Sequence, residues 1–158
     1  MKILVVGGGG REHAIIKKIK ENKAVETIYA LPGNGGIAKD AVCVDIKATD
    51  IEAVRDFAIK EKIDFAIVAP DDPLVLGMVD ELEGNGIPCF GPSKRAAIIE
   101  GSKAFSKELM RNFNIPTAKY EVFDDTVKAK AYIDEHHAPI VIKADGLALG
   151  KGVIIAEN

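Results

Sequence analysis

Short apolar runs that alternate with amphipathic segments constrain the fold of this chain more than any other feature. Runs rich in β-branched residues predict strands at residues 2–6, 26–31, 42–44, 64–69 and 87–90. Helical periodicity predicts helices at residues 11–20, 50–61, 74–83, 93–100 and 102–113. Strands that alternate with helices form mostly parallel sheets covered on both faces. The sequence therefore predicts an α/β fold with a Rossmann-like parallel sheet over residues 1–101.

The pattern changes after Gly101, which indicates a second domain. A strand at 118–123, a helix at 126–135, a buried strand at 139–143 and another strand at 153–156 are predicted there. We expect the boundary between Gly101 and Pro116. The predicted organisation is a first domain at 1–101, a helical linker at 102–117 that starts the next domain, and a small α+β subdomain at 118–158.

Composition excludes several classes of protein. The chain has 158 residues, is 47% apolar and 28% charged, and carries a net charge of −3, which is typical of a soluble globular protein. Its lysines are spread along the chain, so we expect no nucleic-acid partner. No apolar run approaches the roughly 18 residues of a membrane span. Cys43 and Cys89 form no close-spaced pair, which predicts reduced thiols and a cytoplasmic location.

A glycine-rich loop near the end of the chain is the first candidate site. Gly146, Gly150 and Gly152 lie between two predicted strands, with Lys143 before the loop and Lys151 within it. Glycines let backbone amides approach a ligand, and two ammonium groups favour a polyphosphate. An ordinary hairpin with a surface lysine remains an alternative. A Walker P-loop is excluded, because Asp145 stands at its first glycine position and Gly152 at its Ser/Thr position.

The turn after the first strand is the second candidate site. Gly7–Gly10 opens a helix, whose N-terminal amides favour an anion. The dinucleotide fingerprint fails, because Glu12 or His13 stands at its third glycine position, so we expect no nicotinamide cofactor. For the glycine-rich residues 32–36, a tight turn and a binding role are both open. Residues 71–72 either bind a ligand at the sheet edge or cap the following helix.

Four segments of the chain carry a specific family resemblance. They are Gly8-Gly-Gly-Arg-Glu-His-Ala14, Pro32-Gly-Asn-Gly-Gly36, the pair Phe90-Gly-Pro-Ser-Lys94 and Glu100-Gly-Ser-Lys-Ala-Phe-Ser-Lys107, and Val141-Ile-Lys-Ala-Asp-Gly-Leu-Ala-Leu-Gly-Lys-Gly152. Together they resemble the phosphoribosylamine–glycine ligase family, also called glycinamide ribonucleotide synthetase. The resemblance covers essentially the whole chain. It implies a Rossmann-like pre-ATP-grasp domain followed by an incomplete ATP-grasp α+β lid subdomain.

The resemblance also implies a reaction in purine biosynthesis and its participants. ATP would phosphorylate glycine, and the amine of phosphoribosylamine would attack the acyl phosphate. Mg²⁺ or Mn²⁺ would assist, with metal ligands expected beyond residue 158 and none in this chain. The implied ATP-binding residues are Lys103, Lys143, Asp145, Gly146, Gly150, Lys151 and Gly152. The implied substrate-binding residues are Gly8, Gly9, Gly10, Arg11, Glu12, Gly33, Asn34, Pro70 and Asp71.

The sequence departs from the family pattern at three places. Asp71 follows Ala69-Pro70 where the family commonly has Gly-Pro-Glu, and Leu149 replaces a small residue of the loop. The chain resembles only the N-terminal part of the ligase, so we expect it to be inactive alone. Because its lid strands lack the elements that would pack on them, we expect residues 118–158 either to be the least ordered part of the chain or to self-associate with a neighbouring copy. Two alternatives remain: a non-catalytic Rossmann-type module that binds a nucleotide or sugar phosphate, and another ATP-grasp carboxylate–amine ligase.

Overall fold

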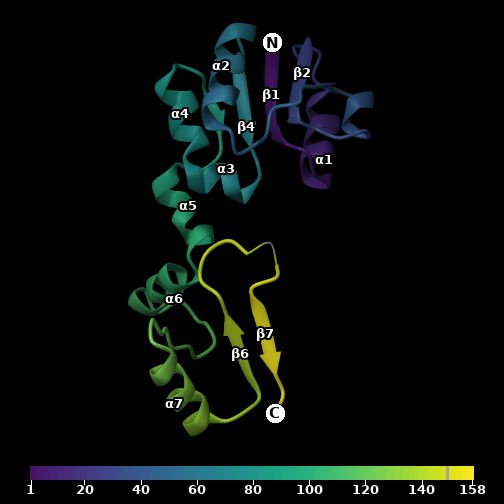
Figure 1. Ribbon diagram of the computed structural model, residues 1–158. Coiled ribbons are helices and arrows are strands. Elements are labelled where there is room, and N and C mark those ends of the chain that lie inside the picture. Colours follow the sequence, from purple (N-terminus) through teal and green to yellow (C-terminus); the bar gives the residue numbers. More distant parts are fainter. Residues whose placement is uncertain (149) are drawn as a thin grey trace. The chain divides into compact units, whose positions relative to one another are not determined.

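The computed structural model describes residues 1–148 and 150–158, which form two compact units, Met1–Ile98 and Ile99–Asn158 (Figure 1). Leu149, where the sequence departs from the family pattern, lies outside the described residues. None of the described helices is long and apolar enough to span a membrane.

The first unit contains a five-stranded parallel sheet in the order β3-β2-β1-β4-β5. The parallel α/β fold predicted from the alternation of strands and helices is thereby confirmed. Its strands are β1 (Lys2–Gly7), β2 (Thr27–Pro32), β3 (Val42–Cys43), β4 (Phe65–Val68) and β5 (Cys89–Phe90). Its helices are α1 (Gly10–Ile19), the short 3₁₀ helix η1 (Ile37–Lys39), α2 (Ile51–Glu61), α3 (Asp71–Leu76) and α4 (Met78–Gly84), and α5 (Lys94–Gly101) contains the division between the units.

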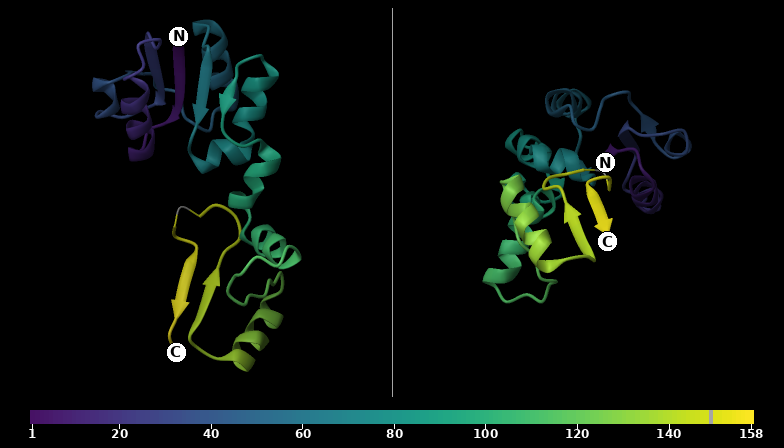
Figure 2. Two further views of the ribbon diagram at one scale, coloured as in Figure 1. Left: turned by 180° about the vertical axis from the view of Figure 1, so that it is seen from behind. Right: turned by 60° about the horizontal axis from the view of Figure 1, so that its bottom comes forward.

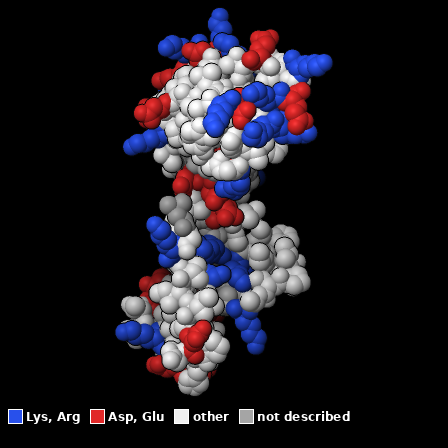
Figure 3. All heavy atoms as spheres, turned by 90° about the vertical axis from the view of Figure 1, so that its right-hand side faces the viewer, with Lys and Arg blue, Asp and Glu red and all other residues white. Residues whose placement is uncertain are grey.

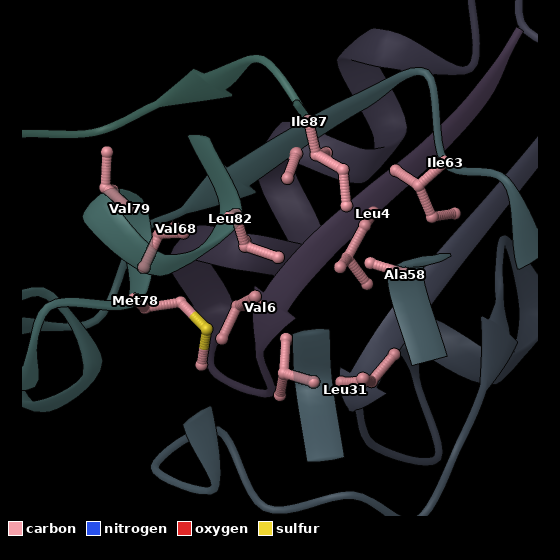
Figure 4. Close-up of a cluster of buried hydrophobic side chains, with 12 residues drawn as sticks. Leu4, Val6, Leu31, Ala58, Ile63, Val68, Met78, Val79, Leu82 and Ile87 are labelled. Carbon is pink, nitrogen blue, oxygen red and sulfur yellow. The ribbon is translucent and has the colours of Figure 1, made fainter. Parts of the chain in front are cut away.

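Successive side chains of β1 supply the two cores of the first unit. Leu4 and Val6 pack with α2 and α4, and their neighbours in that core converge in Figure 4. Ile3 and Val5 point to the other face and pack with Ile16 of α1. This alternation follows from the two-residue period of a strand. Helices therefore cover both faces of the sheet, α1 on one and α2 with α4 on the other (Figure 2).

Local sequence signals set the helix boundaries, and the structure corrects the predicted helix at 74–83. Asp50 is the N-cap of α2, and its Oδ1 accepts a hydrogen bond from the Ala53 amide at 3.1 Å; the sequence alone leaves this role open between Thr49 and Asp50. The single helix predicted at 74–83 is wrong, since the structure has α3 and α4 there. Gly77 separates them with a φ of 101°, a left-handed conformation that an uninterrupted helix excludes. Helix α3 also begins at Asp71, earlier than predicted.

The second unit contains two helices and a β-hairpin. They are α6 (Lys103–Asn112), α7 (Thr126–His136) and the antiparallel strands β6 (Ile140–Lys143) and β7 (Val153–Ala156). The strand predicted at 118–123 is wrong, because this segment pairs with no described strand. Instead, Lys107 Nζ donates to Thr117 Oγ1 at 2.6 Å and to the Ala118 carbonyl at 3.2 Å.

The hairpin of the second unit is more exposed than its apolar sequence predicts. Val141 of β6 is 51% exposed and Ile155 of β7 is 69% exposed, so the prediction of a buried strand at 139–143 is wrong for this chain, whereas the expectation that the lid strands are uncovered agrees with the structure. A two-stranded hairpin has no second layer of its own, so its apolar side chains stay open unless another element covers them.

Candidate functional site

The two glycine-rich turns of the first unit lie against each other. The Gly33 amide donates to the Gly7 carbonyl at 3.2 Å. Asn34 Nδ2 donates to the Gly8 carbonyl at 2.7 Å. A methyl group added at Gly8 would overlap the Gly33 carbonyl oxygen, so the turns approach as closely as glycine allows. These turns follow β1 and β2, which are neighbours, and together they form a cradle at the carboxyl end of the sheet.

Asn34 holds this cradle together through three hydrogen bonds to the backbone. Besides the bond to Gly8, its Oδ1 accepts from the Gly36 amide at 2.7 Å and from the Ile37 amide at 2.9 Å. The side chain predicted to bind substrate is thus already engaged with the protein. The sequence pattern could not reveal this, because it does not tell which way an asparagine points.

Glu12 lies beneath the first turn of the cradle. Its side chain is buried, and its Oε2 accepts a hydrogen bond from the Gly9 amide at 2.6 Å, which caps α1. Among the described residues, its other oxygen, Oε1, has no hydrogen-bond partner. A side chain at Gly7 would meet Glu12 Cγ at 2.7 Å, and the φ of 122° there favours glycine. Glu12, predicted to bind substrate, therefore supports the turn from inside.

Arg11 and Asp71 present charged groups at the rim of the cradle. Arg11 Nη2 lies 3.9 Å from Asp71 Oδ1, and their side chains are 71% and 42% exposed. Pro70 is the N-cap of α3, and Asp71 lies in its first turn, where a carboxylate suits the helix dipole. Because β4 is the other neighbour of β1, the structure brings all three predicted substrate-binding segments to one edge of the sheet.

A cluster of charges lies beside the cradle, on α1 and after η1. The carboxylate of Asp40 lies within ion-pair distance of three basic side chains: His13 Nε2 at 3.1 Å, Lys20 Nζ at 3.1 Å and Lys17 Nζ at 3.2 Å. These contacts, His13 first, hold the pKa of Asp40 well below its usual range. On the face of the first unit shown in Figure 3, basic and acidic side chains are intermixed rather than gathered into one basic patch.

The second unit brings together residues from both predicted parts of its nucleotide site. Lys103, at the start of α6, donates from Nζ to the Gly146 carbonyl at 2.6 Å. Asp145 accepts hydrogen bonds from the Ala104 amide at 3.2 Å and from the Ser102 hydroxyl at 3.1 Å. The Ala104 amide is the main cause of the lowered pKa of Asp145, with further help from the Gly146 amide and the Ser102 hydroxyl.

Ser102 was missed by the sequence analysis as part of this cluster. Its position before α6 is a recognisable N-cap signal, and its Oγ accepts from the Phe105 amide at 3.1 Å. Its bond to Asp145 joins residues that are 43 positions apart, and no short-range pattern predicts such a pair.

The loop between β6 and β7 closes through its own backbone. The Ala144 amide donates to the Gly152 carbonyl, and the Lys151 amide to the Ala148 carbonyl, both at 2.8 Å. Gly146 and Gly150 have φ values of 84° and 74°, which favour glycine. The side chains of Lys143 and Lys151 are exposed. The loop thus combines exposed ammonium groups with glycines, as a polyphosphate site requires.

Comparison with known families assigns the chain to the ATP-grasp class and to one family within it. The family model described as "Phosphoribosylglycinamide synthetase, N domain" matches residues 1–100, and "Phosphoribosylglycinamide synthetase, ATP-grasp (A) domain" matches residues 101–158. The chain belongs to the phosphoribosylglycinamide synthetase family. The resemblance inferred from the four sequence motifs is thereby confirmed.

Curated relatives agree with this assignment. Phosphoribosylamine–glycine ligase of Caldanaerobacter subterraneus subsp. tengcongensis is 52% identical over 158 residues, covering 100% of this chain and 38% of the relative. The ligase of Listeria monocytogenes is 54% identical over 157 residues, covering 99% of this chain and 37% of the relative. The chain thus spans about 38% of the length of the curated relatives that it matches.

Solved structures show the same fold. Phosphoribosylamine–glycine ligase of Thermotoga maritima superposes with a TM-score of 0.79 at 29% identity, covering 100% of this chain and 36% of that chain. The biotin carboxylase domain of Hydrogenobacter thermophilus 2-oxoglutarate carboxylase, solved with ADP and magnesium, has a TM-score of 0.79 at 23% identity, covering 99% of this chain and 37% of that chain.

Proposed function

We propose that this chain forms the sugar-phosphate site and the first part of the nucleotide site of a ligase that joins glycine to 5-phosphoribosylamine with ATP. The observation that carries the proposal is the identity of about 50% over the whole chain with ligases of that name. Because the chain spans about 38% of their length, the activity belongs to a protein of the relatives' length. The 158 residues alone should be inactive.

The cradle of the first unit is suited to the phosphate of phosphoribosylamine. Helix α1 directs its N-terminal amides and the positive end of its dipole toward the turn Gly8–Gly10. Arg11, largely exposed, adds a guanidinium that can bind a phosphate with two hydrogen bonds. Gly33 brings the second turn into the cradle, and Asp71 supplies carboxylate oxygens at the rim that suit sugar hydroxyls. We assign Glu12 and Asn34 to holding the cradle in shape.

The second unit is suited to the phosphates of ATP. Lys103 and Lys143 are the cations that would offset charge on the transferring phosphoryl group. The glycines of the loop, Gly146, Gly150 and Gly152, let its amides approach the phosphates, with Lys151 nearby. A loop of this kind can also exclude water from an acyl phosphate.

The proposed reaction has two steps. First, a carboxylate oxygen of glycine attacks the γ-phosphorus of ATP, and ADP leaves with the electron pair of the broken bond. Second, the amine of phosphoribosylamine attacks the carbonyl carbon of glycyl phosphate. The bond from that carbon to the phosphate oxygen breaks, phosphate leaves, and the nitrogen loses a proton to give the amide. In both steps the residues of this chain bind and orient the reactants and exclude water.

A divalent metal ion is expected for such a ligase, but the described residues do not provide its site. Within residues 1–148 and 150–158, no three His, Cys, Asp or Glu side chains gather in a way that could hold a metal ion. We therefore derive no step through a metal. That its ligands lie beyond residue 158 stays a prediction.

A chimeric ligase tests the proposed activity. Its residues 1–158 come from this chain, and the remainder comes from the Caldanaerobacter ligase, with which the chain shares 52% identity. We expect ADP release that requires both glycine and phosphoribosylamine, and no such release from the 158-residue chain alone. Release with another carboxylic acid but not with glycine would contradict the proposal.

Titration of the 158-residue chain tests the cradle separately. Ribose 5-phosphate should shift the backbone amide resonances of Gly7–Glu12, because the phosphate would lie at the N-terminus of α1. NAD is the matched control, since it carries phosphates in a shape that the broken fingerprint does not fit. Shifts with NAD and none with the sugar phosphate would refute the assignment.

A further inference from the structure

The strongest unassigned feature is the contact between the loop that follows β6 and the first turn of α6. Asp145 Oδ1 accepts from the Ala104 amide at 3.2 Å, and the Ser102 hydroxyl lies 3.3 Å from Oδ1 and 3.1 Å from Oδ2. The next loop residue, Gly146, accepts at its carbonyl from Lys103 Nζ at 2.6 Å. Consecutive residues of the loop are thus bound by consecutive residues of the helix.

Capping of α6 does not account for Asp145. Ser102 is already the N-cap, since its Oγ accepts from the Phe105 amide at 3.1 Å. A hydroxyl can donate while it accepts, so Ser102 caps the helix and still donates to Asp145. Asp145 comes from a segment 41 residues further along the chain than Ala104. Its contacts therefore attach the loop to a helix that has its own cap.

The N-cap of α7 makes the difference clear. Asp125 Oδ1 accepts from the amides of Val127 and Lys128 at 2.7 and 2.9 Å, both in the helix that Asp125 itself precedes. Asp125 and Asp145 therefore both accept amide hydrogen bonds at a helix N-terminus in the second unit. Only Asp145 joins two separate segments.

We propose that Asp145 is a positioning residue for the nucleotide, rather than a direct contact to it. Together with Ser102 it holds the glycine-rich loop on α6, so that Lys103 and the loop glycines face a phosphate as one unit. The proposal rests on the proposed nucleotide site. Lys103 Nζ donates to the Gly146 carbonyl at 2.6 Å, and its ammonium has further protons that can be donated to a phosphate oxygen. Asp145 keeps the loop next to that ammonium.

Amide hydrogen exchange in the 158-residue chain tests the attachment. Asp145→Ala should speed exchange about threefold to tenfold at Ala144 and Lys151, whose amides are hydrogen-bonded within the loop; this is the loss expected for a solvent-exposed hydrogen-bonded carboxylate. Exchange at Val5, in the first unit, should stay unchanged. The matched control Asp125→Ala should speed exchange in α7 and leave the loop unaffected. Unchanged loop exchange in Asp145→Ala would overturn the proposal.

Kinetics of the chimeric ligase test the positioning role. Asp145→Ala should raise KM for ATP about threefold to tenfold and leave KM for glycine unchanged. Asp145→Asn should restore most of the loss, because an amide oxygen still accepts from Ala104. Ser102→Ala combined with Asp145→Ala should raise KM for ATP by less than the product of the two single effects, since the two side chains share one contact.

Three kinetic results would overturn the proposal. They are equal rises in KM for ATP and for glycine, no recovery in Asp145→Asn, and additive effects of the two alanine substitutions, as expected for a side chain that contacts the nucleotide independently. An inactive wild-type chimera would refute the proposed function instead. The exchange experiment would then decide by itself whether Asp145 holds the loop.

Discussion

Replacing Gly8 with alanine should separate the two turns of the cradle. The added methyl group would overlap the backbone carbonyl oxygen of Gly33, and backbone cannot move aside as a flexible side chain can. Two hydrogen bonds depend on the present spacing, one from the Gly33 amide to Gly7 at 3.2 Å and one from Asn34 Nδ2 to Gly8 at 2.7 Å. At roughly 0.5–1.5 kcal/mol each, their loss should cost about 1–3 kcal/mol of unfolding free energy.

Gly10→Ala is the matched control for this substitution. Gly10 is the first residue of α1, and a methyl group added there would meet no atom within 4 Å apart from its chain neighbours and the backbone of its own helix. Alanine at such a position should leave the stability unchanged or raise it by up to about 1 kcal/mol, because it restricts the unfolded chain. The two substitutions therefore make the same chemical change in the same turn, with opposite expected results.

Amide exchange at Val5 is the assay, because Val5 is fully buried in β1 and reports on the first unit alone. The chain has two compact units, and a single transition followed by circular dichroism would not separate the unfolding of the first from that of the second. A loss of about 1–3 kcal/mol corresponds to exchange about fivefold to 150-fold faster in Gly8→Ala. Exchange within about twofold of wild type would refute the reasoning, and so would an equal effect of Gly10→Ala.

Three further predictions concern charge and thiol chemistry. The pKa of Asp40 is lowered in the folded state, so its stabilisation is complete above the unfolded pKa of about 3.9 and declines as the pH falls from there toward the lower folded pKa. Asp40→Asn should therefore lower the urea midpoint at pH 7 and lower it by less at pH 2.5, and an equal difference at both would contradict this. Burial raises the pKa of Cys89 to about 12. In the Cys43→Ser variant, the thiol of Cys89 should therefore react with a thiol reagent at pH 8 about tenfold to a hundredfold more slowly in the folded chain than in the urea-unfolded chain. Equal rates in the two states would contradict this prediction. In the chimeric ligase, Lys143→Ala should raise KM for ATP about tenfold to a hundredfold, and Lys151→Ala should raise it much less, because Lys143 ends a strand with a fixed direction. Equal effects of the two substitutions would show that Lys143 is not the main cation for the phosphates.

Local patterns predicted the first unit well because its signals act over a few residues. The continuous apolar run Ile3-Leu-Val-Val6 predicts a strand buried on both faces, and the structure has a hydrophobic core on each face of the sheet. Thr49 and Asp50 before an amphipathic run predict the start of α2, and Asp50 is its N-cap. Gly77 did not reveal the helix break, since an isolated glycine inside a helical pattern is often tolerated.

The second unit was predicted less well because burial is a property of the whole fold. Val141 and Ile155 belong to apolar runs that predict buried strands, yet both are exposed in this chain. Residues 118–123 have the composition of a strand, but a strand forms only where another supplies hydrogen-bond partners. The motif of the loop predicted Asp145 as part of a site, whereas its contact with Ser102 follows from a tertiary approach that no spacing encodes.

The two proposed phosphate sites are held by different kinds of contact, and this difference matches the different tasks proposed for them. In the cradle, a backbone bond between Gly33 and Gly7 and the close approach at Gly8 fix two turns that follow adjacent strands. Backbone contacts of this kind cannot be released without disturbing the sheet, which suits a site that keeps one substrate in one orientation. The loop of the second unit is attached to α6 through the side chains of Asp145 and Lys103. Side chains can exchange partners while the helix and hairpin stay intact, which suits the proposed task of a site whose nucleotide enters and leaves in each turnover.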